Sequence, residues 1–130
     1  MKSRWGALVV LALVLVAGLV TLSCKKKSNP AGPGGAADVT INIIGAGLGA
    51  NAYSPNPDTV TVGQTVAWHN TNGITHTATS DAGPGSVFNT GNVGGGGTSA
   101  PITMTAAGSY PYHCAIHGAV SMSGTLVVRP

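Results

Sequence analysis

Hydrophobic residues recur at every second position in several short segments between residues 38 and 130. Val39, Ile41 and Ile43, for example, alternate with Thr40 and Asn42. Alternation of this kind with β-branched residues is typical of half-buried strands. Five segments with this period are predicted to be strands: 39–43, 59–62, 65–69, 102–105 and 125–128.

Turn-forming residues separate these segments, and no window has the 3.6-residue period of an amphipathic helix. Glycine or proline stands at 45, 55, 63, 83 and 108, among other positions. Many short strands divided by turns predict an all-β fold, a Greek-key sandwich or barrel. The glycine-rich stretch 91–97 is expected to be a flexible loop where the chain can fray.

A second glycine-rich stretch, 43–50, imitates a dinucleotide-binding motif. That motif requires a helix N-terminus after the glycines to hold the pyrophosphate. Here Pro55 and Pro57 follow and prevent a helix, and no βαβ unit surrounds the motif. The stretch is therefore interpreted as a loop between two strands.

The first 23 residues are predicted to be a signal peptide or a membrane anchor. Lys2 and Arg4 precede an apolar run from Trp5 to Leu22, a length that suits a signal-peptide core or a marginal membrane span. A buried helix of the domain would have a polar face, and this run has none.

Cys24 follows in the context Thr21-Leu-Ser23-Cys24, which resembles a bacterial lipoprotein processing site with the cysteine as the lipidated residue. The small Ser23 fits that pattern, whereas Thr21 stands where leucine is usual. An uncleaved anchor and simple secretion remain as alternatives. Three lysines at 25–27 weigh against the anchor, because they would lie on the exported side.

The rest of the chain divides into a linker and one domain. Residues 24–37 combine Cys24, the lysines and a Pro/Gly/Ala/Ser-rich linker. Residues 38–130 have the size of an ordinary single-core domain.

The positive charge of the chain belongs to its N-terminal region. The formal net charge is +3, yet within 38–130 one arginine stands against three aspartates, a charge of −2. The basic residues therefore indicate a membrane-proximal stalk and not a nucleic-acid partner.

The domain contains one cysteine, Cys114, which needs an explanation because an exported protein would ordinarily pair its thiols. Cys114, His117 and Met122 lie within nine residues, and His76 ends an upstream polar segment. A cysteine and two histidines in a plane, with a long axial methionine, is the blue-copper arrangement. The sequence therefore predicts one copper ion in a type 1 site held by these four residues.

Two further histidines are expected to be bystanders because of their strand phase. Tyr112 and Cys114 share an inward face, so His113 points outward, and His69 is out of phase with Trp68.

The spacing Cys114-x2-His117-x4-Met122, together with the segment from Tyr53-x-Pro55 to His76-Thr77, resembles the cupredoxin family, above all its plastocyanin-like members. The similarity extends over 38–130. It implies a sandwich of about eight strands with copper at one end and His117 as the electron port.

The resemblance and the chemistry together suggest two supporting residues. Asn70 is expected to tie the two ligand-bearing loops together by hydrogen bonds. The backbone N–H of Thr77 is expected to bond the Cys114 sulfur, which would withdraw charge from it.

The predicted function is electron transfer outside the cytoplasm, with no substrate site and no enzyme activity. The expected partners are membrane-bound or periplasmic redox proteins. They would dock on an apolar patch with little dependence on salt, and the domain itself is expected to be monomeric. The patch is expected to contain residues 46–48, Ile74, Ile116, Ala119 and Val120.

The alternative is a copper-binding or copper-delivery protein outside the cytoplasm. Nitrite reductases and multicopper oxidases need further copper sites, for which the sequence has no spare histidine cluster. A binuclear site of the CuA type would need a second cysteine in the loop.

Overall fold

The computed structural model describes residues 35–85 and 87–130. The predicted signal or anchor segment, Cys24 and most of the linker lie outside these residues. In the described part of the chain, no helix is both long enough and apolar enough to span a membrane.

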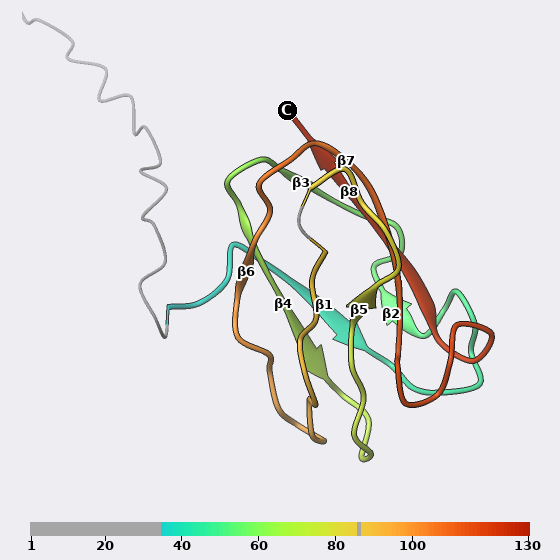
Figure 1. Cartoon of the computed structure of the whole chain (residues 1–130). Coiled ribbons are helices and arrows are strands. Elements are labelled where there is room, and N and C mark those ends of the chain that lie inside the picture. The colour runs from blue at the N-terminus through green and yellow to red at the C-terminus, as the bar shows by residue number, and fades with distance from the viewer. Residues whose placement is uncertain (1–34, 86) are drawn as a thin grey trace, which may run out of the picture.

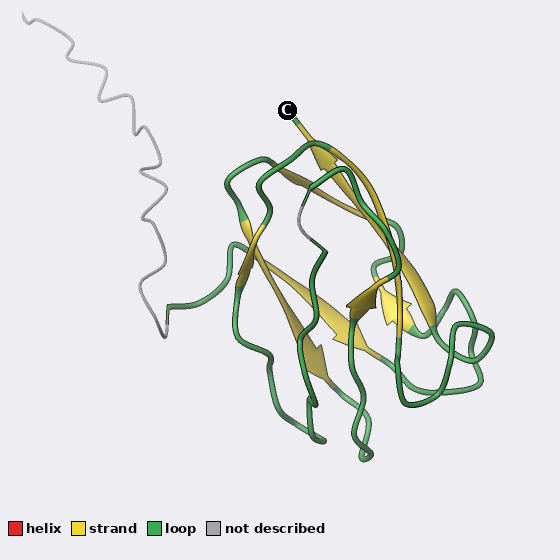
Figure 2. Ribbon diagram, in the orientation of Figure 1, coloured by secondary structure: helices red, strands yellow, loops and turns green. Residues whose placement is uncertain are grey.

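Within that part the fold is all-β, as the alternating pattern predicts, with strands joined by long loops (Figures 1 and 2). One sheet has the order β2-β1-β4-β6 and the other β3-β8-β7-β5. The eight strands are β1 Val39–Ile43, β2 Tyr53–Ser54, β3 Asp58–Thr61, β4 Thr65–Asn70, β5 Thr79–Ser80, β6 Ile102–Thr103, β7 Gly108–His113 and β8 Ser123–Arg129.

Strand pairing brings distant segments together at one end of the sandwich. β1 and β4 run parallel, so that Ile43 pairs with Asn70 where both strands end. β7 and β8 are antiparallel, and His113 at the end of β7 pairs with Ser123 at the start of β8. The loops that follow β1, β4 and β7 thus lie away from the C-terminus (Figure 1).

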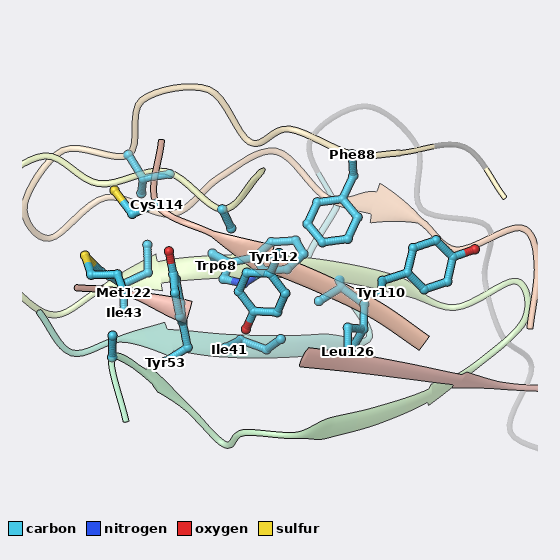
Figure 3. Packing of buried hydrophobic residues seen from close by; sticks show 14 of the residues in the cluster. Ile41, Ile43, Tyr53, Trp68, Phe88, Tyr110, Tyr112, Cys114, Met122 and Leu126 are labelled. Atoms are coloured by element: carbon cyan, nitrogen blue, oxygen red, sulfur yellow. The ribbon is translucent and has the colours of Figure 1, made fainter. Parts of the chain in front are cut away.

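Aromatic residues from both sheets fill the core between them (Figure 3). Trp68 of β4 is fully buried and lies 5.0 Å from Phe88 and 5.6 Å from Tyr112, measured between ring centroids. The T-shaped pair of Trp68 and Tyr112 adds a specific geometry to the area that both rings bury. This packing fixes β4 against β7, the two strands that precede the predicted ligand segments.

Three positions, Val62, Thr65 and Ala67, depart from the simple alternation. Val62 was expected on the inner face, but it lies outside β3 with 43% of its surface exposed. Its N–H bonds Arg129 O at the end of β8, where the chain enters the turn to β4. Thr65 and Ala67 of β4 are buried although they are out of phase with Val66 and Trp68.

Candidate metal centre

The predicted ligands come from two loops at the same end of the sandwich. His76 lies in the loop after β4, and Cys114 follows directly on β7. His117 and Met122 belong to the loop that returns to β8. This loop is closed by backbone bonds, from Gly118 N to Cys114 O at 2.8 Å and from Met122 N to Gly118 O at 3.0 Å.

Three ligand atoms meet at one point. His76 Nδ1 lies 3.2 Å from His117 Nδ1, and the Cys114 Sγ lies 3.9 Å and 3.3 Å from these two nitrogens. These residues are the one group of three or more histidine, cysteine or acidic side chains within the described residues whose atoms could share a metal ion.

The size of this triangle fits a metal ion. A point equally distant from its three corners would lie roughly 2 Å from each, close to ordinary metal–nitrogen and metal–sulfur bond lengths. Because the three sides are similar in length, the donors surround that point evenly. A thiolate with two imidazoles is a donor set that suits copper in both oxidation states.

Met122 completes the arrangement. Its side chain is fully buried, and its carbonyl accepts a bond from Cys114 N at 3.2 Å. The sulfur atoms of Met122 and Cys114 lie at the same end of the core cluster (Figure 3). Together with His76 and His117 they are arranged like a type 1 copper site.

The two histidines differ in environment. His76 is fully buried, and its pKa is lowered by that burial and, to a lesser degree, by the neighbouring His117. Both influences favour the neutral imidazole that can bind a metal. His117, by contrast, is only half-buried. The other nitrogen of His76, Nε2, has no hydrogen-bond partner in the described part of the chain.

Thr77 connects the two ligand loops. Its N–H points to the Cys114 Sγ at 3.3 Å, which is the contact expected from the sequence. Its Oγ1 accepts a second bond from Ala115 N at 2.8 Å. Thr77, which directly follows the ligand His76, thus contacts both the ligand Cys114 and its neighbour Ala115.

Asn70 has a different role from the one expected. Its side chain donates to Ile74 O and Val93 O at 2.7 Å and 2.8 Å and accepts from Asn72 N at 2.9 Å. These bonds close the His76 loop on itself and on residue 93, and they do not reach the Cys114 loop. The two ligand loops are linked by Thr77 instead. The side-chain amide of Asn70 bonds only to residues of the His76 loop and to Val93.

The glycine-rich stretch 91–97 was expected to fray, but it is hydrogen-bonded to the His76 loop. Val93 and His76 exchange two backbone bonds, and Gly96 N donates to Asn70 O. A Cβ added at Gly95 would come within 3.0 Å of the backbone of residues 72 and 73. Glycine is needed here because the two backbones approach closely.

The two remaining histidines lie outside the cluster. His113 faces away from Cys114, and its Nδ1 lies beside the Asp81 carboxylate. His69 Nδ1 contacts the hydroxyl of Thr98 at 2.9 Å.

Two contacts near the centre were missing from the sequence analysis. The Tyr53 hydroxyl donates to Thr77 O, and the Ser121 hydroxyl accepts from Gly47 N. The partners are 24 and 74 residues apart, so no local spacing could have indicated them.

Comparison with known sequences agrees with this chemistry. The profile of copper binding proteins of the plastocyanin/azurin family matches residues 39–129. Plastocyanin from Scenedesmus fuscus is 30% identical over 99 residues, which cover 71% of this chain and all of that protein. The minor chloroplastic plastocyanin isoform of Arabidopsis thaliana is 29% identical over 96 residues, covering 67% of this chain and 56% of its own length.

Solved structures of copper proteins have the same fold. A purple cupredoxin from Nitrosopumilus maritimus superposes with a TM-score of 0.57 at 28% identity, covering 71% of this chain and all of the other. A Cu(I) form of amicyanin superposes with a TM-score of 0.55 at 26% identity, and the match covers 70% of this chain and 81% of amicyanin. The copper-containing nitrite reductase of Thermus scotoductus superposes with a TM-score of 0.61 at 28% identity. The match covers 78% of this chain but only 25% of the nitrite reductase chain.

Proposed function

The chain belongs to the plastocyanin/azurin family of copper-binding proteins, and on this premise we propose that it carries single electrons between redox partners outside the cytoplasm. The observation that carries this proposal is the meeting of His76 Nδ1, His117 Nδ1 and the Cys114 Sγ at distances that one metal ion can bridge.

In this proposal His76, Cys114, His117 and Met122 would together hold the copper ion. The bound ion supplies one-electron chemistry between Cu(II) and Cu(I). The residues supply a fixed geometry, since His76, Cys114 and Met122 are fully buried and their loops are hydrogen-bonded to each other. Ligands that cannot move keep the rearrangement between the two oxidation states small.

His117 is the proposed point of electron entry and exit, because this residue is partly exposed whereas His76 is fully buried. Apolar side chains from three loops are exposed at the same end of the fold. Ile74 is 51% exposed, Ile116 52% and Val120 98%, and Leu48 from the loop after β1 is also exposed. We call these four residues the apolar rim and propose that redox partners dock on it.

The charge distribution supports docking that depends little on salt. The charged side chains of the described residues are Asp38, Asp58, Asp81 and Arg129, and the two ligand loops contain none of them. Steering by charge is therefore weak, and contact relies on the apolar rim.

We further propose that the domain acts as a monomer at a membrane surface, with membrane-bound or periplasmic redox partners. Support comes from the sequence alone: the apolar run 5–22, Cys24 in its lipoprotein-like context and the lysines at 25–27. Mass spectrometry of the mature protein would identify a lipidated Cys24, and an unmodified N-terminus at Met1 would contradict the lipoprotein assignment.

Electron self-exchange tests the carrier function against copper delivery. The copper-loaded full chain should exchange electrons between its oxidised and reduced forms rapidly and should retain Cu(I) when mixed with a protein that accepts Cu(I). Slow self-exchange together with ready loss of Cu(I) would favour delivery instead.

A carrier without a substrate site of its own is part of this proposal. A nitrite reductase is among the structural relatives, but the likeness covers a quarter of that protein. A second histidine-rich cluster that could bind substrate-activating copper is not found in residues 35–85 and 87–130.

A further inference from the structure

Thr77 is held from its carbonyl side as well as from its amide and hydroxyl. Tyr53 OH donates to Thr77 O at 2.6 Å in the protein interior. Within the described residues no other donor is bonded to this carbonyl. On its carbonyl side, the residue that contacts the Cys114 Sγ is therefore held by one tyrosine hydroxyl from β2.

Tyr53 is well placed for such a role because its own position is fixed. It is 1% exposed, and it pairs with Ile43 at the end of β1. Its ring meets the ring of Tyr112 edge-on, with centroids 4.8 Å apart and an interplanar angle of 67°. Its hydroxyl points toward the side of the core where the sulfur of Cys114 lies (Figure 3).

The hydroxyl of Tyr53 remains a donor at all ordinary pH values. Burial raises the pKa of Tyr53 well above its usual range, with smaller contributions from Cys114 and Tyr112. A buried phenol that stays protonated keeps the proton that it donates to a carbonyl acceptor.

We propose that Tyr53 is a positioning residue for the metal centre: its hydroxyl fixes the Thr77 backbone so that the Thr77 N–H stays on the sulfur of Cys114. This inference rests on the proposed function, in which Cys114 is a copper ligand. A hydrogen bond to a thiolate withdraws negative charge from it and favours the reduced metal. Tyr53 would thus set the reduction potential without touching copper.

The test compares Tyr53→Phe with Tyr110→Phe in the full chain. Tyr110 is a matched control because it is also fully buried and also donates to a backbone carbonyl, that of Ala106 at 2.9 Å. It lies at the other end of the aromatic cluster from Cys114 (Figure 3). Both variants lose one hydroxyl that donates to a backbone carbonyl, which is buried at Thr77 and partly buried at Ala106.

The first measurement is hydrogen exchange of the Thr77 amide in the metal-free chain. Tyr53→Phe should accelerate it roughly tenfold or more, because the backbone around Thr77 is released. Tyr110→Phe should leave it unchanged. Equal exchange of this amide in the wild type and Tyr53→Phe would overturn the proposal, and this readout does not depend on copper binding.

The second measurement uses the copper-loaded chain. Tyr53→Phe should lower the reduction potential and shift the thiolate-to-copper absorption band, whereas Tyr110→Phe should change neither. The same potential and band in the wild type and Tyr53→Phe would overturn the proposal. A wild type that forms no such band would refute the proposed function, and the metal-free exchange would still decide the role of Tyr53.

A third measurement needs no variant and covers the case in which Tyr53→Phe does not fold. In the wild-type chain the hydroxyl proton of Tyr53 should be protected from exchange with solvent and detectable by NMR. A hydroxyl proton that exchanges freely would contradict the proposal.

Discussion

Single polar contacts decide how the ligands of this protein are held, and Thr77 makes contacts through its amide, its hydroxyl and its carbonyl. Its amide contacts the Cys114 Sγ, its hydroxyl accepts from Ala115 N, and its carbonyl accepts from Tyr53 OH. Its partners are Cys114 and Ala115 in the ligand loop after β7 and the buried Tyr53 in β2. One residue thereby connects segments that are far apart in the chain.

Replacing Thr77 by valine should destabilise the metal-free protein by about 1 kcal/mol, because the Ala115 N–H loses its acceptor while the side-chain volume is kept. Chemical denaturation of the full chain measures this change. The control is Thr103→Val in β6, an exposed threonine whose hydroxyl bonds no described residue. Similar effects of the two substitutions would show that the Thr77 hydroxyl does not hold the loops together.

At the scale of the element, the His76 loop is stabilised mainly by the side chain of Asn70. Asn70→Ala would leave the carbonyl of Ile74 and the N–H of Asn72 without their partner and should destabilise the fold by about 3 kcal/mol. The matched substitution Asn42→Ala, at an exposed position of β1, should cost less than about 0.5 kcal/mol. Equilibrium unfolding in denaturant measures both, and equal losses would contradict this role of Asn70.

The start of β1 is joined to β4 by a clamp between Asp38 and Thr65. Thr65 donates its N–H and its hydroxyl to Asp38 Oδ2, each at 2.8 Å. These bonds, the backbone one first, lower the pKa of Asp38 below its ordinary value of 3.8. The clamp therefore stabilises the fold above that pH, and its contribution is lost as the pH falls through the lower pKa of the folded state.

The wild type should accordingly be more stable than Asp38→Asn near neutral pH, and the difference should shrink as the pH falls below 3.8 and through the lower pKa of the folded state. Urea unfolding of both proteins across this range measures the difference. A gap that stays constant down to the lowest pH would mean that the Asp38 carboxylate does not stabilise β1.

Strands and ligand loop were predictable from the sequence because both depend on local spacing. The alternation in 39–43 and 65–69 gave β1 and β4, and the order Cys114, His117, Met122 placed three of the ligands in one loop. The two-residue strands β2 and β5 have no such period, so they were not predicted. Contacts such as Thr77 with Ala115 span 38 residues, and only the pairing of distant strands creates them.

Chain topology also explains why the structure differs from two predictions near the metal centre, those for Asn70 and for residues 91–97. Asn70 was assigned to a link between the ligand loops, but the sequence could not show that residue 93 lies beside it. The glycines at 91–97 suggested flexibility because glycine lacks a Cβ. In the folded chain the same property lets them approach the His76 loop closely and bond to it.

At the scale of the whole molecule, the apolar rim should govern encounters between molecules. Val120→Asp would place like charges in contact when two copies meet through their rims. Electron self-exchange should therefore slow roughly tenfold at low salt and recover when salt is added. Stopped-flow or NMR line broadening measures the rate, and the reduction potential should not change.

Val62→Asp is the matched control, because Val62 is also exposed but lies beside Arg129 at the far end of β8. It should leave self-exchange unchanged. If both variants slow the rate equally, or if neither does, docking does not occur at the rim.

Adding Cu(II) to the reduced, metal-free full chain and recording its visible spectrum tests the central claim most directly. We predict that a single copper ion per chain produces an intense blue band from charge transfer between the Cys114 thiolate and copper. The band should be absent in Cys114→Ser and preserved in His113→Ala. A colourless wild type, or a band that survives in Cys114→Ser, would contradict the assignment of His76, Cys114, His117 and Met122 as a type 1 copper site.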